Sequence, residues 1–169
     1  MLKLLGWVDR IVGAVLGPVV VAGMVALTFV ISLQIVSRVF FTSVTWTEEV
    51  ARFLLIWITF LGATLAFQQG RHIAVQLARD SLPDNLRRIV IGAGILVSIT
   101  FLGTLTWIGW QYMDLQSFQR SPSLRIPMNN IYLVMPVASG LMAAMSCIDL
   151  VRLLTGDTTI RDRMRDVVE

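Results

Sequence analysis

Four stretches of this 169-residue chain contain no charged side chain, and they constrain the fold more than any other feature. They cover residues 11–37, 53–70, 89–113 and 126–148. A helix rises about 1.5 Å per residue and the bilayer core is about 30 Å thick, so roughly 20 apolar residues cross it. The second stretch reaches this length from residue 50, because Arg52 can place its charged head at the membrane surface. The sequence therefore predicts an all-α membrane protein with four transmembrane helices.

The predicted spans leave no room for a soluble domain between them. They cover approximately 11–37, 50–70, 87–113 and 126–149. The first is longer than the apolar part of a secretory signal, so we expect it to remain uncleaved. The chain is thus expected to form a single four-helix membrane domain over 1–169, with a short cytoplasmic tail over 150–169.

Basic residues predict the orientation of these spans. Short cytoplasmic loops carry an excess of Lys and Arg. The N-terminal segment, the second loop and the C-terminal tail carry ten of the 14 Lys and Arg residues, and the first and third loops carry four. Both termini are therefore expected in the cytoplasm.

The second loop, residues 71–88, supports two interpretations. Ile73, Ala74 and Leu77 lie on one face of a helical projection, which predicts a short amphipathic helix at the membrane interface. The alternative is that the loop is only a basic topology signal.

The start of the second span places charges against an apolar run, in TSVTWTEEVARFLLIWI (42–58). Thr45 and Glu48 have the spacing of a capping box, and Glu48 precedes Arg52 by four residues, the favourable order for an ion pair. Together with Glu49, these residues either cap a helix at the membrane surface and do nothing more, or they also contact a partner membrane protein.

Six residues near the ends of the first two spans are candidates for such a partner interface. Gln34 is the most polar side chain within the first span, and Arg38 follows it by one turn. The full set is Gln34, Arg38, Trp46, Glu48, Glu49 and Arg52.

The third loop and the fourth span contain prolines that restrict the backbone. Pro122 and Pro127 in RSPSLRIP (120–127) predict a fixed connector, and Pro136 predicts a kink in the last span. Small residues four apart, in the pairs Gly13–Gly17 and Gly62–Ala66, allow close helix approach and are expected to pack within the bundle.

The sequence lacks the groups of polar and ionisable side chains that catalysis usually needs. No ionisable residue lies at mid-membrane, His72 is the only histidine, and Cys147 is the only cysteine. We therefore expect no catalytic, cofactor-binding or metal site. The protein is not expected to be an enzyme. The arginines flank spans instead of forming one patch, which favours contact with membrane lipid and not with nucleic acid.

Three functions remain open on these grounds. The first is a non-catalytic scaffold subunit of a larger transporter. The second is an independent small homo-oligomeric membrane transporter, which the lack of a mid-membrane charge disfavours. The third is a membrane anchor subunit of a redox enzyme, which the single histidine disfavours.

Several segments together resemble the small membrane subunit, of DctQ type, of tripartite ATP-independent periplasmic (TRAP) transporters. They are WTEEVAR (46–52), HIAV (72–75) and SPSLRIP (121–127), followed by Tyr132 and Pro136. The resemblance extends over most of the chain. Gln76 departs from the pattern, since an acidic residue often stands at this position in the family.

This resemblance implies a role within a sodium-driven transport complex. The small subunit would pair with the large membrane subunit (M), which carries the sodium and substrate sites. A periplasmic substrate-binding protein (P) would deliver an organic acid of the C4-dicarboxylate or sialic acid class. The complex would lie in the bacterial inner membrane, with the small subunit enlarging the static scaffold of the large one.

Overall fold

The described parts of the chain are almost entirely helical. The computed structural model describes residues 2–40, 45–81 and 84–154, with side chains at 12–40, 45–70, 89–151 and 153–154. The long helices are α1 (Leu2–Phe40), α2 (Thr45–Ser81), α3 (Asp84–Leu115) and α5 (Val134–Leu154). Two short helices, η1 (Gln116–Phe118) and α4 (Met128–Tyr132), flank the loop between α3 and α5.

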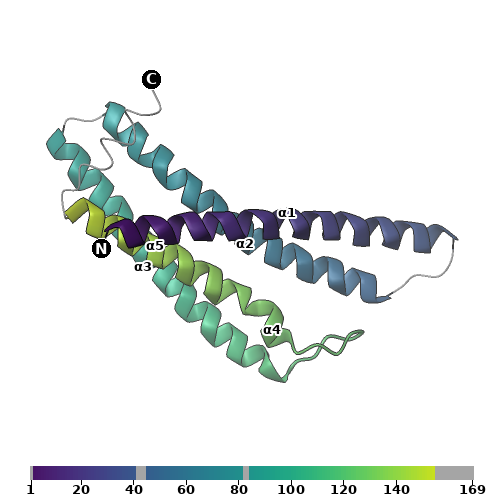
Figure 1. Ribbon diagram of the computed structural model, residues 1–169. Coiled ribbons are helices and arrows are strands. Elements are labelled where there is room, and N and C mark those ends of the chain that lie inside the picture. Colours follow the sequence, from purple (N-terminus) through teal and green to yellow (C-terminus); the bar gives the residue numbers. More distant parts are fainter. Residues whose placement is uncertain (1, 41–44, 82–83, 155–169) are drawn as a thin grey trace.

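Four helical segments are long and apolar enough to cross a membrane, as the sequence predicts. They are Val12–Phe40, Thr45–Gly70, Ile89–Phe118 and Met128–Val151. The start of α1 and the end of α5 lie at the same end of the molecule (Figure 1), as an even number of crossings requires.

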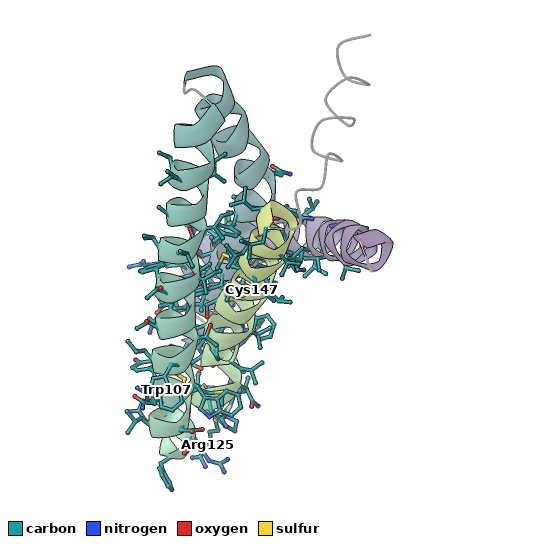
Figure 2. The ribbon with its side chains drawn as sticks, turned by 90° about the vertical axis from the view of Figure 1, so that its left-hand side faces the viewer. Trp107, Arg125 and Cys147 are labelled. Atoms are coloured by element: carbon teal, nitrogen blue, oxygen red, sulfur yellow. The ribbon has the colours of Figure 1, made fainter. Side chains whose placement is uncertain are left out.

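The helices form a row of two pairs, not a closed bundle. α1 packs on α2, α3 packs on α5, and α2 joins the pairs by packing on α5. In the view along α1, this helix stands to one side of α3 and α5 (Figure 2). Accordingly, no residue in the most apolar part of α1 is buried, against 44% in the span that ends in α5.

α1 packs on α2 through one narrow stripe. Apart from Val12 and Gly17, its less exposed residues recur at alternating spacings of three and four: Gly13, Leu16, Val20, Gly23, Leu27, Val30, Gln34 and Ser37. This is the spacing of a seam between two helices that lie side by side. A Cβ atom at Gly23 would lie 2.9 Å from Cγ1 of Ile58, and one at Gly13 would lie 3.1 Å from Oε1 of Gln68. Glycine is therefore what permits this approach.

The expected small-residue pairs are only partly used within the chain. Gly13 packs on α2 as predicted, whereas a Cβ atom at Gly17 or Gly62 would meet nothing within 4 Å. Gly17 and Gly62 thus lie against open space, although they were predicted to pack within the bundle.

α3 and α5 make the best-packed part of the molecule. Leu102, Ala138, Met142 and Met145 are buried there. The Thr106 hydroxyl lies 3.0 Å from the buried Ser139 hydroxyl, and each hydroxyl also lies within hydrogen-bond distance of a carbonyl oxygen of its own helix. Because each hydroxyl is satisfied, this polar contact is accommodated between two apolar helices.

The interruption of the last span lies near Pro136, as predicted. The helical assignment breaks at Leu133, between α4 and α5, and Pro136 falls in the first turn of α5. Proline has no N–H, so it cannot donate to the carbonyl of residue 132, and the helix is weakened there. Gly109 of α3 comes close to this turn, since a Cβ atom on it would lie 3.3 Å from the Pro136 nitrogen.

The predicted short amphipathic helix in the second loop is wrong. Residues 71–81 continue α2 without a break, so that this helix has 37 residues. At about 1.5 Å per residue it is roughly 55 Å long and exceeds the bilayer core. The last turns of α2 and the first turns of α3 extend beyond the other helices at one end (Figure 1).

The close approach at Gly23 yields a stability prediction. Gly23→Val forces the branched side chain against Ile58 and should destabilise the α1–α2 pair by about 1–3 kcal/mol. The measurement is thermal unfolding in detergent, followed by tryptophan fluorescence. Gly17→Val is the matched control on the same helix, because its Cβ atom has open space. Equal melting temperatures for the two variants would contradict the seam.

Candidate functional site

The six candidate residues lie at one end of the molecule, where α1 ends and α2 begins. This end, which also carries the loop between α3 and α4, is called the loop end below. Gln34 is half-buried, and its Nε2 lies 3.4 Å from Oε1 of Glu48. The Gln34 side chain therefore faces the neighbouring helix.

Glu49 has the most specific environment of the six. Its side chain is only 8% exposed. One carboxylate oxygen accepts the backbone N–H of Ser123 at 2.7 Å, and the other accepts that of Leu124 at 3.0 Å. A side chain of α2 therefore binds the backbone of a loop more than 70 residues away.

The loop that Glu49 binds is a closed turn. The Ser121 N–H donates to Ile126 at 3.0 Å, and the Arg125 N–H donates back to the Ser121 carbonyl at 3.1 Å. The Met128 N–H donates to Gln119 at 3.0 Å, so the two flanks of the loop are also joined. These bonds confirm the predicted fixed connector.

The chemical basis of the Glu49 contact is that of a helix cap. The turn after Ser121 leaves successive N–H groups that point in one direction, and such groups attract an anion. A carboxylate satisfies two of them with charge-assisted bonds, which are stronger than bonds between neutral groups. Glu49 caps this turn from another helix.

Arg52 supplies the nearby positive charge. It is the cation whose field acts on both Glu49 and Tyr132. The ring of Tyr132 meets that of Tyr112 edge to face, with centroids 5.0 Å apart. Arg52 is therefore part of a polar layer that joins α2, α3 and α4 at the loop end.

The structure changes the predicted local pairing of these charges. The expected partner of Arg52 is Glu48, but the field of Arg52 acts on Glu49 and Glu48 meets Gln34. Thr45 is already the first helical residue of α2, so the N-cap position falls on residue 44, outside the described residues. The predicted capping box therefore stays a prediction, while Glu48 contacts the neighbouring helix through Gln34.

The six residues thus divide into two groups. Glu49 is buried and its carboxylate is occupied within the chain, and Gln34 is half-buried and contacts Glu48. Arg38, Glu48 and Arg52 are exposed, and Trp46 is 43% exposed despite its size. Only this second group offers its side chains to another molecule, so the loop end presents charge and aromatic surface.

In the described ranges, no three His, Cys, Asp or Glu side chains form a metal-binding group.

Sequence reasoning did not find the partners of Glu49. Ser123 and Leu124 contribute backbone N–H groups, which carry no side-chain signal. The serine and two prolines at 121, 122 and 127 indicate a turn, but not which acid caps it.

The Glu49 contact predicts a protease-sensitive loop when the carboxylate is neutralised. Glu49→Gln removes the charge and one of the two acceptors, and should therefore weaken the closed loop. Trypsin cleavage after Arg120 and Arg125, followed by mass spectrometry in detergent, should then be several-fold faster than in the wild type, because local opening limits it. Glu48→Gln is the matched control, and equal cleavage rates in both variants would show that the loop is held by other contacts.

Comparison with known proteins extends this description. Residues 27–156, more than half of the chain, match the family of tripartite ATP-independent periplasmic transporters, DctQ component. The chain is 35% identical, over 87% of its length, to the isethionate TRAP transporter permease protein DctMQ of Oleidesulfovibrio alaskensis, and it spans about a quarter (24%) of that relative.

Two further relatives cover less of the chain. The C4-dicarboxylate TRAP transporter small permease protein DctQ of Rhodobacter capsulatus is 27% identical over 57% of this chain, which spans 44% of that protein. The sialic acid TRAP transporter small permease protein SiaQ of Vibrio cholerae is 24% identical over 70% of this chain and 69% of its own length. With four membrane-spanning helices and a family match over residues 27–156, the chain belongs to the DctQ component family of TRAP transporters.

Proposed function

We propose that this chain is the small permease subunit of a sodium-driven TRAP transporter and acts as a non-catalytic scaffold. It pairs with the large membrane subunit, and a periplasmic binding protein delivers the substrate. The complex takes up an organic acid across the bacterial inner membrane. In this arrangement both termini of the chain lie in the cytoplasm and the loop end faces the periplasm.

The row of helices is the observation that carries the scaffold proposal. α1 uses one stripe to pack on α2 and leaves the rest of its circumference uncovered. An open row supplies broad apolar surface on which a larger membrane protein can pack. The relative DctMQ adds support, because the part similar to this chain is about a quarter of a much longer permease protein.

The substrate class is proposed from the names of the relatives. The names of relatives include isethionate, C4-dicarboxylate, sialic acid and ectoine. The first three are organic anions and ectoine also carries a carboxylate, which supports uptake of an organic acid. We place the residues that choose among them on the other subunits.

We propose that the exposed residues of the loop end form part of the contact with the large subunit. Arg38, Trp46, Glu48 and Arg52 provide it, and Gln34 and Glu49 act indirectly by fixing the helices that carry these side chains. A large exposed tryptophan is typical of the residues that contribute most to interfaces.

Purification of the tagged chain from its native membrane tests the subunit role. In mild detergent, a much larger multi-span protein should accompany it in equal amount, as mass spectrometry would show. Recovery of the chain alone, or only as a homo-oligomer, would overturn the proposal and favour an independent small transporter. A haem absorption band in the purified complex would instead favour a redox-enzyme anchor.

The interface is tested by two matched tryptophan substitutions. Trp46→Ala should reduce recovery of the large subunit at least tenfold, because loss of an interface tryptophan often costs about 2 kcal/mol or more. Trp110→Ala removes a similarly exposed tryptophan from α3, at the other edge of the row, and should leave recovery unchanged. If the two substitutions act equally, the contact does not lie on the α1–α2 side.

A further inference from the structure

Arg125 adopts a backbone conformation that its residue type disfavours. Its φ angle is +55°, and no other described residue except glycine has a positive φ. In this left-handed region the Cβ atom crowds the following carbonyl, which costs roughly 1–2 kcal/mol, whereas glycine has no such penalty. The position in the turn would thus suit glycine better than arginine.

The loop nevertheless holds Arg125 firmly in this conformation. Its N–H donates to the Ser121 carbonyl at 3.1 Å, and Ile126 after it accepts from Ser121. Glu49 holds the preceding N–H groups of Ser123 and Leu124. Strained residues that are held in this way often mark a functional position.

The side chain of Arg125 is free to act on another molecule. Arg120 and Arg125 are both exposed, and neither guanidinium makes a hydrogen bond or an ion pair within the described residues. Arg125 lies at the tip of the loop end, beyond the helix ends and far from Cys147 (Figure 2). Two guanidinium groups on one braced turn suit carboxylates, which they bind through paired N–H donors.

We propose that the loop over residues 120–127 is a docking element for an acidic surface of the transporter's soluble substrate-binding protein, with Arg125 and Arg120 as the pairing cations. This inference rests on the proposed function, which puts the loop end in the periplasm. It goes further by assigning the contact to particular side chains, and it explains why an arginine occupies a turn position suited to glycine.

A protein surface fits this loop better than lipid headgroups do. Headgroups are mobile and can follow an arginine in any backbone conformation, so they give no reason for a strained and braced turn. A folded acidic patch has a fixed geometry, and a guanidinium that is already in position loses less freedom on binding. Charge complementarity would also speed encounter and make it sensitive to salt.

The test measures binding of the purified substrate-binding protein to the complete transporter in phosphatidylcholine nanodiscs. Arg125→Gly should raise Kd roughly tenfold at low ionic strength, equivalent to about 1.4 kcal/mol, and should flatten the salt dependence. Its melting temperature should equal or exceed that of the wild type, because the backbone strain is relieved. Arg125→Lys keeps the charge but loses the paired N–H donors, so its Kd should lie between those of the wild type and Arg125→Gly.

The controls separate the possible failures. Arg161→Gly removes one arginine from the C-terminal segment and should leave Kd unchanged. If Arg125→Gly binds like the wild type, the docking proposal is wrong, although co-purification with a large subunit would still support the proposed function. If the effect of Arg125→Gly appears only in nanodiscs that contain phosphatidylglycerol, the loop binds anionic lipid and the proposal is overturned. If the wild-type chain recovers no large subunit, the proposed function itself fails.

Discussion

The carboxylate of Glu49 and the two N–H groups that it accepts hold the two helix pairs together at the loop end. A carboxylate that is largely removed from water is costly unless hydrogen bonds and an opposite charge compensate it. Ser123, Leu124 and the field of Arg52 supply that compensation. The same bonds fix the turn that carries Arg125, so the position of the loop depends on a side chain of α2.

Away from the loop end, packing depends on small residues. Lipid chains are as apolar as the helices, so helices gain from association only where they approach closely or form polar contacts. Gly13 and Gly23 permit this approach between α1 and α2, and Gly109 permits it between α3 and the start of α5. The large apolar side chains of α1, such as Phe29 and Val25, are mostly outside these contacts and exposed.

The parts of the fold that depend only on the order of residues along the chain could be predicted. The four spans follow from the cost of placing charges in hydrocarbon, and the interruption near Pro136 follows from the missing N–H. The continuation of α2 to Ser81 was missed, because an amphipathic pattern fits a separate interfacial helix and an extended one equally well. Of the site, sequence identified Glu49 and the stiff loop, but not the contact between them.

The contact between Glu49 and the loop was missed because contacts within the start of α2 explained the same charged residues. Thr45, Glu48 and Arg52 fit the rules for a helix start, and such rules involve only residues within one turn of each other. Partners such as Ser123 and Leu124, on another element, become visible only when the chain is folded. The open sides of Gly17 and Gly62 were missed for a related reason, since spacing shows that two small residues share a helix face but not what the face meets.

The separation of 74 residues between Glu49 and Ser123 has a consequence for the order of assembly. Each helix pair is made of helices that are near one another in sequence, and contacts of this kind form early. α1 and α2 leave the ribosome before the turn at 121–126 has been synthesised, so Glu49 enters the membrane surface without its donors. The carboxylate finds them only after the third span has been inserted and the chain has turned back, which makes this contact a marker that the third span has come to lie beside the second.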